Sequence, residues 1–80
     1  MTNSEYIAFR NFQVDLSDRK LGYLRDHVYV EEDRLYLIYD IDYTDIHISW
    51  RLGDKFVRVN SCMEPVTWFQ RRRLKKLLNK

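Results

Sequence analysis

Glycine, proline and cysteine are scarce in this chain of 80 residues. Two glycines and one proline leave no room for long flexible linkers or low-complexity tracts. The one cysteine, Cys62, excludes an internal disulfide and suits a reducing compartment, where we expect it to act as a small buried hydrophobic residue. The sequence therefore indicates one domain over residues 1–80 in a cytoplasmic setting.

Long apolar runs are also missing. No stretch approaches the ~20 residues that a membrane span needs, and the N-terminus lacks the apolar core of a signal peptide. Hydrophobic residues nevertheless make up 45% of the chain and aromatic residues 15%, which indicates a folded domain rather than disorder. We expect no membrane contact.

Charge is balanced over the whole chain but not along it. The formal net charge is +2, yet residues 31–54 carry seven acidic and two basic side chains, whereas residues 55–80 carry eight basic and one acidic. A chain that separates charge in this way presents an acidic and a basic surface at once. Both surfaces are therefore candidate binding sites.

Apolar and polar residues alternate through residues 35–52, which predicts an amphipathic β-hairpin. A turn at Tyr43 and Thr44 places the apolar residues of both strands on one face. Neither residue suits a type I′ turn, so a longer loop with the same two faces is the alternative. The pairs expected on the apolar face are Ile41 with Ile46, Tyr39 with Ile48, Leu37 with Trp50 and Leu35 with Leu52.

Two further turns extend this hairpin into a four-stranded antiparallel meander over residues 27–60. Gly53 and Asp54 suit a two-residue turn, and residues 32–33 suit another. Three turns that agree on one apolar face favour a real sheet. The further pairs predicted are Trp50 with Val57, Ile48 with Val59, Val30 with Leu35, Val28 with Leu37 and, on the outer face, Tyr29 with Tyr36.

The two ends of the chain are expected to be helical, which makes the fold class α+β. Pro65 suits the first position of a helix over residues 65–78. An N-terminal helix capped by Ser4 is preferred to an alternating strand, and a brief second helix follows Ser17. This N-terminal segment covers one face or edge of the sheet. The apolar stripe of the C-terminal helix, expected to dock on the inner sheet face, comprises Val66, Phe69, Leu74, Leu77 and Leu78. The N-terminal helix would align Tyr6, Phe9 and Phe12, whereas the alternative strand would align Ile7, Phe9 and Asn11.

Acidic and aromatic side chains share the outer face of the predicted sheet. They form either a second core layer under residues 1–26 or an exposed binding surface. No second histidine or cysteine converges on the acidic cluster, so we expect no metal and no cofactor. No nucleophile or glycine-rich phosphate loop accompanies it, so we expect no enzyme. The residues assigned to partner binding are Tyr29, Tyr36, Asp40, Asp42, Asp45 and His47.

The polar half of the C-terminal helix is strongly basic. An indole beside several cations is typical of nucleic-acid binding, although such a run is also typical of a solvated surface or of cations near a helix C-terminus. Arg73 lies at the edge of the apolar stripe, so we expect it to extend along that stripe or to pair with a sheet carboxylate. The residues assigned to this alternative site are Trp68, Arg71, Arg72, Lys75 and Lys76.

These features favour a small non-enzymatic interaction protein that binds, and inhibits or modulates, a larger macromolecular target. A protein partner is preferred, and a homodimer is also compatible with these surfaces. The size and composition resemble those of phage and mobile-element proteins directed against host defence, such as anti-CRISPR proteins. The acidic residues would imitate a phosphate array, and Glu31, Glu32 and Asp33 would add to it. The alternative is a nucleic-acid-binding module that uses the C-terminal helix.

Overall fold

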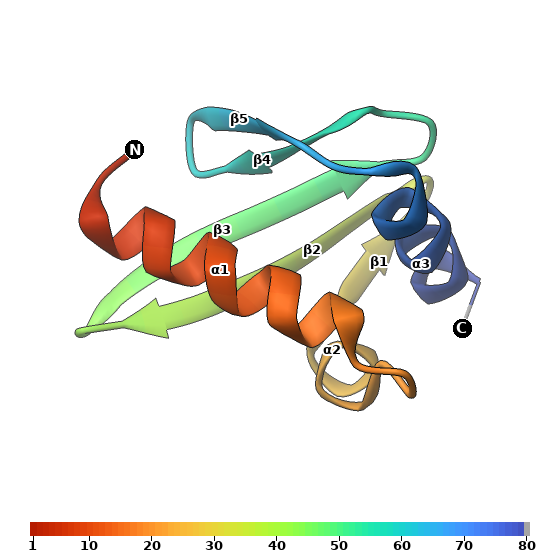
Figure 1. Cartoon of the computed structure of the whole chain (residues 1–80), viewed down its shortest axis with the longest axis horizontal. Coiled ribbons are helices and arrows are strands. Elements are labelled where there is room, and N and C mark those ends of the chain that lie inside the picture. The colour runs from red at the N-terminus through yellow and green to blue at the C-terminus, as the bar shows by residue number, and fades with distance from the viewer. Residues whose placement is uncertain (80) are drawn as a thin grey trace.

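The computed structural model describes residues 1–79, in which an antiparallel sheet of five strands carries three helices (Figure 1). The α+β class and the C-terminal helix are confirmed, but the sheet has five strands and not four. In chain order the elements are α1 (Asn3–Ser17), α2 (Gly22–His27), β1 (Tyr29–Glu31), β2 (Arg34–Ile41), β3 (Thr44–Arg51), β4 (Phe56–Val59), β5 (Cys62–Pro65) and α3 (Trp68–Leu78).

Each strand pairs with the strand that follows it, so the spatial order is β1-β2-β3-β4-β5. Three predicted pairs are confirmed: Tyr29 lies opposite Tyr36, Val30 opposite Leu35, and Ile48 opposite Val59. Val28 is not in a strand, because it ends α2. Local turns therefore determine most of the topology.

The β2–β3 turn lies one residue earlier than predicted, which shifts each residue's partner on the other strand by two residues. Its central residues are Asp42 and Tyr43, with φ of 50° and 65°, so Tyr39 lies opposite Ile46. A type I′ turn needs positive φ at both central positions. Aspartate tolerates that conformation, whereas a β-branched threonine does not, so Thr44 joins the strand. A slip of two residues keeps every side chain on its predicted face.

The β3–β4 turn also lies one residue earlier than predicted. The Asp54 N–H donates to the Arg51 carbonyl at 2.9 Å, so Leu52 and Gly53 are the central residues. Gly53 has φ of 93°, which a residue without Cβ adopts without strain. The predicted inner position of Leu52 is therefore wrong, since its side chain is 47% exposed and Trp50 lies opposite Leu35 instead.

A fifth strand occupies the segment predicted as a connector and the start of the last helix. β5 pairs with β4, and Pro65 lies opposite Phe56 at the sheet edge, where a missing N–H is tolerated. The helix begins later, after Thr67. The Thr67 hydroxyl accepts from the Gln70 N–H at 3.2 Å, and the Gln70 side chain accepts from the Thr67 N–H at 2.8 Å. This capping box defines the start of α3.

The N-terminal helix is confirmed over the alternative strand, although its cap is Thr2 and not Ser4. Residues Ala8, Phe9, Phe12 and Leu16 of α1 are buried at helical spacing, while Tyr6 points to solvent. The second helix begins after Leu21, which adopts φ of 53°, rather than at Ser17. The N-terminal helix is therefore a large part of the core.

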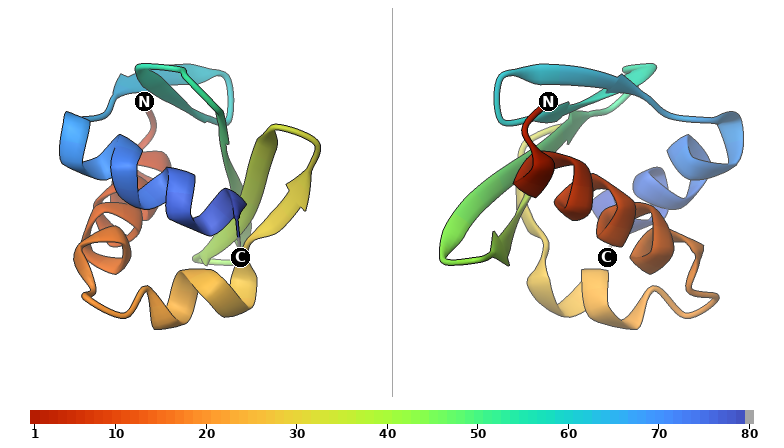
Figure 2. Two further views of the ribbon diagram at one scale, coloured as in Figure 1. Left: turned by 90° about the vertical axis from the view of Figure 1, so that its right-hand side faces the viewer. Right: turned by 60° about the vertical axis from the view of Figure 1, so that its left-hand side comes forward.

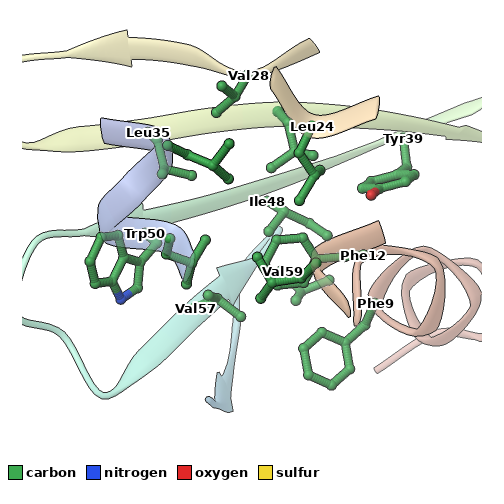
Figure 3. Close-up of a cluster of buried hydrophobic side chains, with 14 of the residues drawn as sticks. Phe9, Phe12, Leu24, Val28, Leu35, Tyr39, Ile48, Trp50, Val57 and Val59 are labelled. Carbon is green, nitrogen blue, oxygen red and sulfur yellow. The ribbon is translucent and has the colours of Figure 1, made fainter. Parts of the chain in front are cut away.

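All three described helices pack on the inner face of the sheet (Figure 2). α1 contacts β2 and β3, and α3 packs beside α1 and against β2. Leu74 and Leu77 are buried as predicted, whereas Phe69 is 72% exposed, so its predicted place in the apolar stripe is wrong. Side chains from the helices and from the inner face interlock in one core (Figure 3).

A buried carboxylate joins the start of α1 to the β4–β5 turn. Glu5 accepts from the Thr2 N–H at 2.7 Å and from the Asn60 side-chain amide at 2.9 Å. Asn60 in turn accepts from the His47 backbone N–H at 2.9 Å. Hydrogen bonds from Thr2 and Asn60 hold the pKa of the Glu5 carboxyl below its ordinary value of 4.5.

The lowered pKa of Glu5 predicts a pH-dependent contribution to stability. The charged carboxylate stabilises the fold above its unfolded pKa, and that contribution is lost as the pH falls through the lower folded pKa. Urea unfolding between about pH 7 and pH 3 is expected to show a gap between the parent and Glu5→Gln that narrows on acidification. Exposed Glu31→Gln is the control. A gap that is constant with pH would contradict the assignment.

Candidate interaction surfaces

The outer face of the sheet is uncovered. Since α1 and α2 pack on the inner face, the alternative in which residues 1–26 cover the outer face is wrong. Successive registers place one row of side chains across all five strands of the described chain. In order from β1 to β5, the outer row comprises Tyr29, Tyr36, Ser49, Arg58 and Met63.

Aromatic and apolar side chains dominate this outer row and its neighbours. Tyr29 and Tyr36 have ring centroids 6.1 Å apart, and 63% and 38% of their side chains are exposed. Ile38 and Phe56, beside the row, are about half exposed. Tyr29, Tyr36 and Ile38 are thus grouped on neighbouring strands, and an exposed aromatic group of this kind is typical of a contact surface.

The distal part of the β2–β3 hairpin forms a two-stranded arm, residues 37–47, that extends away from the other strands (Figure 1). β1 pairs only with residues 34–36, and β4 only with residues 48–49 of β3. The arm is held on its inner side by the Tyr39 hydroxyl, which donates to the Asp15 carboxylate at 2.5 Å. Burial, reinforced by this carboxylate, raises the pKa of Tyr39, so the hydroxyl stays protonated.

The outer side and tip of the arm are acidic. Asp40 lies directly opposite Asp45, and both are exposed, as is Asp42 in the turn. Like charges directly opposite each other destabilise a sheet. Stability of the free chain therefore does not explain this pair.

His47 lies one row further along the sheet, opposite Ile38. Its side chain is exposed, and its backbone N–H donates a hydrogen bond to the Asn60 side-chain oxygen. Among residues 1–79, no three histidine, cysteine or acidic side chains are grouped closely enough to hold a metal ion. The structure thus brings His47 onto the same face as the tyrosines and the acidic arm.

The acidic residues at the other end of β2 are partly neutralised. Arg51 Nε lies 3.0 Å from the Asp33 carboxylate. This hydrogen bond and the adjacent positive charge hold the pKa of Asp33 below its usual value. Glu31 and Glu32 lie beside that pair, at the opposite end of β2 from Asp42. The six carboxylates therefore do not form one continuous array.

Tyr43 is a candidate contact residue that the sequence assignment omitted. It occupies the tip of the arm with φ of 65°, and its side chain is fully exposed. An aromatic residue gains nothing for folding in such a place and bears the cost of left-handed backbone. The sequence did carry a signal for this residue, because Tyr43 lies between Asp42, which favours a turn, and Thr44, which starts β3.

The basic residues of α3 separate into two groups. Trp68, Arg71, Arg72 and Lys75 line an open pocket of about 400 Å³ that they share with the β3–β4 turn. Lys76 does not line it. The Arg72 guanidinium carbon lies 5.5 Å from the centroid of the Trp68 ring, a cation–π arrangement.

Arg73 has a structural role that differs from the predicted pairing with a sheet carboxylate. Its guanidinium donates to the carbonyls of Leu16 and Asp18, at the C-terminal end of α1. A cation there satisfies carbonyls that have no partner within the helix and complements the helix dipole. Arg73 thereby joins α3 to α1.

Cys62, expected to be buried, is half-buried on the edge strand β5.

Comparison with protein-family models, curated proteins and solved structures found no match to this chain. Within residues 1–79, no helix has the length and apolar character required to cross a membrane.

Proposed function

We propose that this chain is a small non-enzymatic interaction protein that binds a larger protein partner through its outer sheet face and acidic arm, and thereby inhibits or modulates that partner. The uncovered row from Tyr29 to Met63 is the observation that carries the proposal. Tyrosine and arginine are enriched at the energetic centres of protein interfaces. A rigid sheet presents them with little loss of conformational entropy on binding.

Charge defines the kind of partner. The acidic arm carries Asp40, Asp42 and Asp45 beside the aromatic row, so the matching surface on the partner is a basic groove next to an apolar patch. A groove that ordinarily holds nucleic acid has this character, and occupying it would block its function. The resemblance to phage-type inhibitors of host defence stays a prediction from size and composition.

Capture by immobilised variants tests this surface. We expect the parent chain to retain one stoichiometric protein from a cell lysate, and the double variant Tyr29→Ser, Tyr36→Ser to lose it. In titrations with that purified protein, loss of two central aromatic contacts is expected to weaken binding by roughly thirtyfold or more. Reversal of Asp40, Asp42 and Asp45 to lysine is expected to slow association and to remove much of its salt dependence.

Tyr6→Ser is the matched control, because Tyr6 is also half exposed but lies on α1, on the helical side. It is expected to retain the same protein as the parent chain. Circular dichroism establishes that each variant is folded. Equal retention by the parent, the control and the double variant would disprove the proposal.

A further inference from the structure

A second candidate site lies on the helical side of the sheet, between α3 and the β3–β4 turn. Its pocket of about 400 Å³ is bounded by Trp50, Leu52 and Gly53 on one side and by the first two turns of α3 on the other. Figure 3 shows the Trp50 indole beside the α3 ribbon. The Trp50 indole N–H donates to the Asp54 carbonyl at 2.8 Å, which holds the turn in place. The walls are therefore set by the fold.

Helical spacing places one aromatic and three cationic side chains on the pocket wall. Trp68, Arg71, Arg72 and Lys75 stand at positions i, i+3, i+4 and i+7, which share one helix face. No carboxylate is among the described residues that line the pocket, and none of these cations has an ion pair within residues 1–79. The pocket is therefore strongly positive.

One guanidinium nitrogen of Arg71, Nε, lacks a hydrogen-bond acceptor among the described residues. This nitrogen is enclosed, although the side chain lines the pocket. The Nε therefore forms no internal hydrogen bond that would anchor the guanidinium, and the charged side chain that lines the pocket can bind oxygen acceptors of a ligand. Phosphate oxygens match a guanidinium in both charge and geometry.

Trp68 adds a flat apolar surface beside these cations. With Arg72 in contact with its ring, 56% of the indole side chain is still exposed. Leu52, which is also half exposed, lies on the facing wall. An exposed indole next to cations is the arrangement on which nucleic-acid bases stack while their phosphates are bound.

We propose that this pocket binds single-stranded nucleic acid, with one base on Trp68 and neighbouring phosphates of the strand at Arg71, Arg72 and Lys75. The site is separate from the outer face and does not rest on the function proposed above. A free nucleotide carries the same chemistry, so the experiment compares the two sources. An open pocket lets the strand continue in both directions, which favours the polymer.

Fluorescence anisotropy of a short labelled oligothymidylate is the test. Three phosphate contacts predict a slope of about −2 for the logarithm of affinity against the logarithm of salt, or roughly twentyfold weaker binding at 200 mM than at 50 mM. Lys75→Ala is expected to reduce the magnitude of the slope by about 0.7. Lys76→Ala is the matched control, because it removes the same charge one residue outside the pocket. Equal effects of the two alanine variants would overturn the proposal.

Trp68 variants test the stacking contact. Trp68→Leu is expected to weaken binding about tenfold or more, whereas Trp68→Phe keeps an aromatic surface and most of the affinity. Trp68→Phe also leaves buried Trp50 as the only tryptophan, whose emission reports that the variant is folded. Tryptophan quenching on titration is expected in the parent and is expected to be smaller in Trp68→Phe, where only the buried Trp50 remains.

Competition identifies the source of the ligand. If thymidine monophosphate displaces the labelled oligonucleotide at a concentration similar to that needed of unlabelled oligonucleotide, the ligand of this site is a free nucleotide. If much more thymidine monophosphate is needed, the ligand is the strand. Displacement by an acidic peptide with no effect of Trp68→Leu would identify a peptide site and overturn the proposal. Absence of binding by the oligonucleotide and the nucleotide at low salt would also overturn it.

Discussion

Replacing Phe12 with alanine is expected to lower the free energy of unfolding by about 3–5 kcal/mol, because the side chain is fully buried. Phe12 points from α1 into the core toward Ile48 and Val59 (Figure 3). Removing the ring deletes apolar contacts and leaves a cavity between the helix and the sheet. A domain of this size has a total stability of only ~5–15 kcal/mol, so the variant is expected to lose a large fraction of it.

Urea unfolding followed by tryptophan fluorescence measures this effect, since Trp50 is buried in the same core. Val14→Ala is the control. Val14 lies on the same helix but is 65% exposed, so its change is expected to stay within about 0.5 kcal/mol. Similar midpoints for Phe12→Ala and Val14→Ala would mean that α1 does not pack on the sheet as described.

Replacing Tyr43 with glycine is expected to have opposite effects on stability and on partner binding. Glycine adopts the positive φ of this turn position without a steric cost, which raises stability by about 1 kcal/mol. The same change removes a fully exposed aromatic ring from the tip of the acidic arm. If that ring contacts the partner, affinity falls by tenfold or more. Strain retained at an exposed tip is typical of functional residues.

Glu32→Gly separates the two effects of the Tyr43 change. Glu32 has φ of 57° in the β1–β2 turn, so glycine relieves the same backbone cost there and leaves the arm intact. Denaturant unfolding is expected to show a similar gain in both variants. Titration of the captured partner is expected to show a loss of affinity only for Tyr43→Gly. An unchanged affinity would remove Tyr43 from the contact surface.

Alternation of apolar and polar residues was enough to predict which face of the sheet most side chains of β2 and β3 occupy, although Leu52, just after β3, is an exception. Tyr39, Ile46 and Ile48 are buried, and Tyr36 and Asp40 are exposed, as the pattern indicated. This result did not require the correct turn, because slips of two residues preserve the faces. The register itself depended on backbone geometry at Asp42 and Tyr43, for which the sequence offered no glycine or asparagine as a guide.

The fifth strand was missed for a different reason. Pro65 was assigned to the start of a helix, since proline is common there, but it is equally tolerated on an edge strand. The capping box formed by Thr67 and Gln70 was the signal that favoured the later start. That shift explains why Val66 contributes to the core from outside the helix.

The basic site was predicted only as a collection of residues. A helical wheel groups Lys75 with Lys76, but it contains no information on the position of the β3–β4 turn. The pocket depends on Gly53 and Leu52, which come from another part of the chain, so only tertiary structure separates the lysine that lines it from the one that does not.

The short edges of the sheet have a consequence for how the chain behaves at high concentration. An exposed sheet with aromatic side chains is a template for fibril growth if its edge strands are long and can pair with another chain. Here β1 has three residues, and β5 has four and ends in Pro65, which has no N–H to donate. Backbone pairing between copies is thereby discouraged along β1 and β5, at the two ends of the aromatic row, so recognition at these edges is left to side chains.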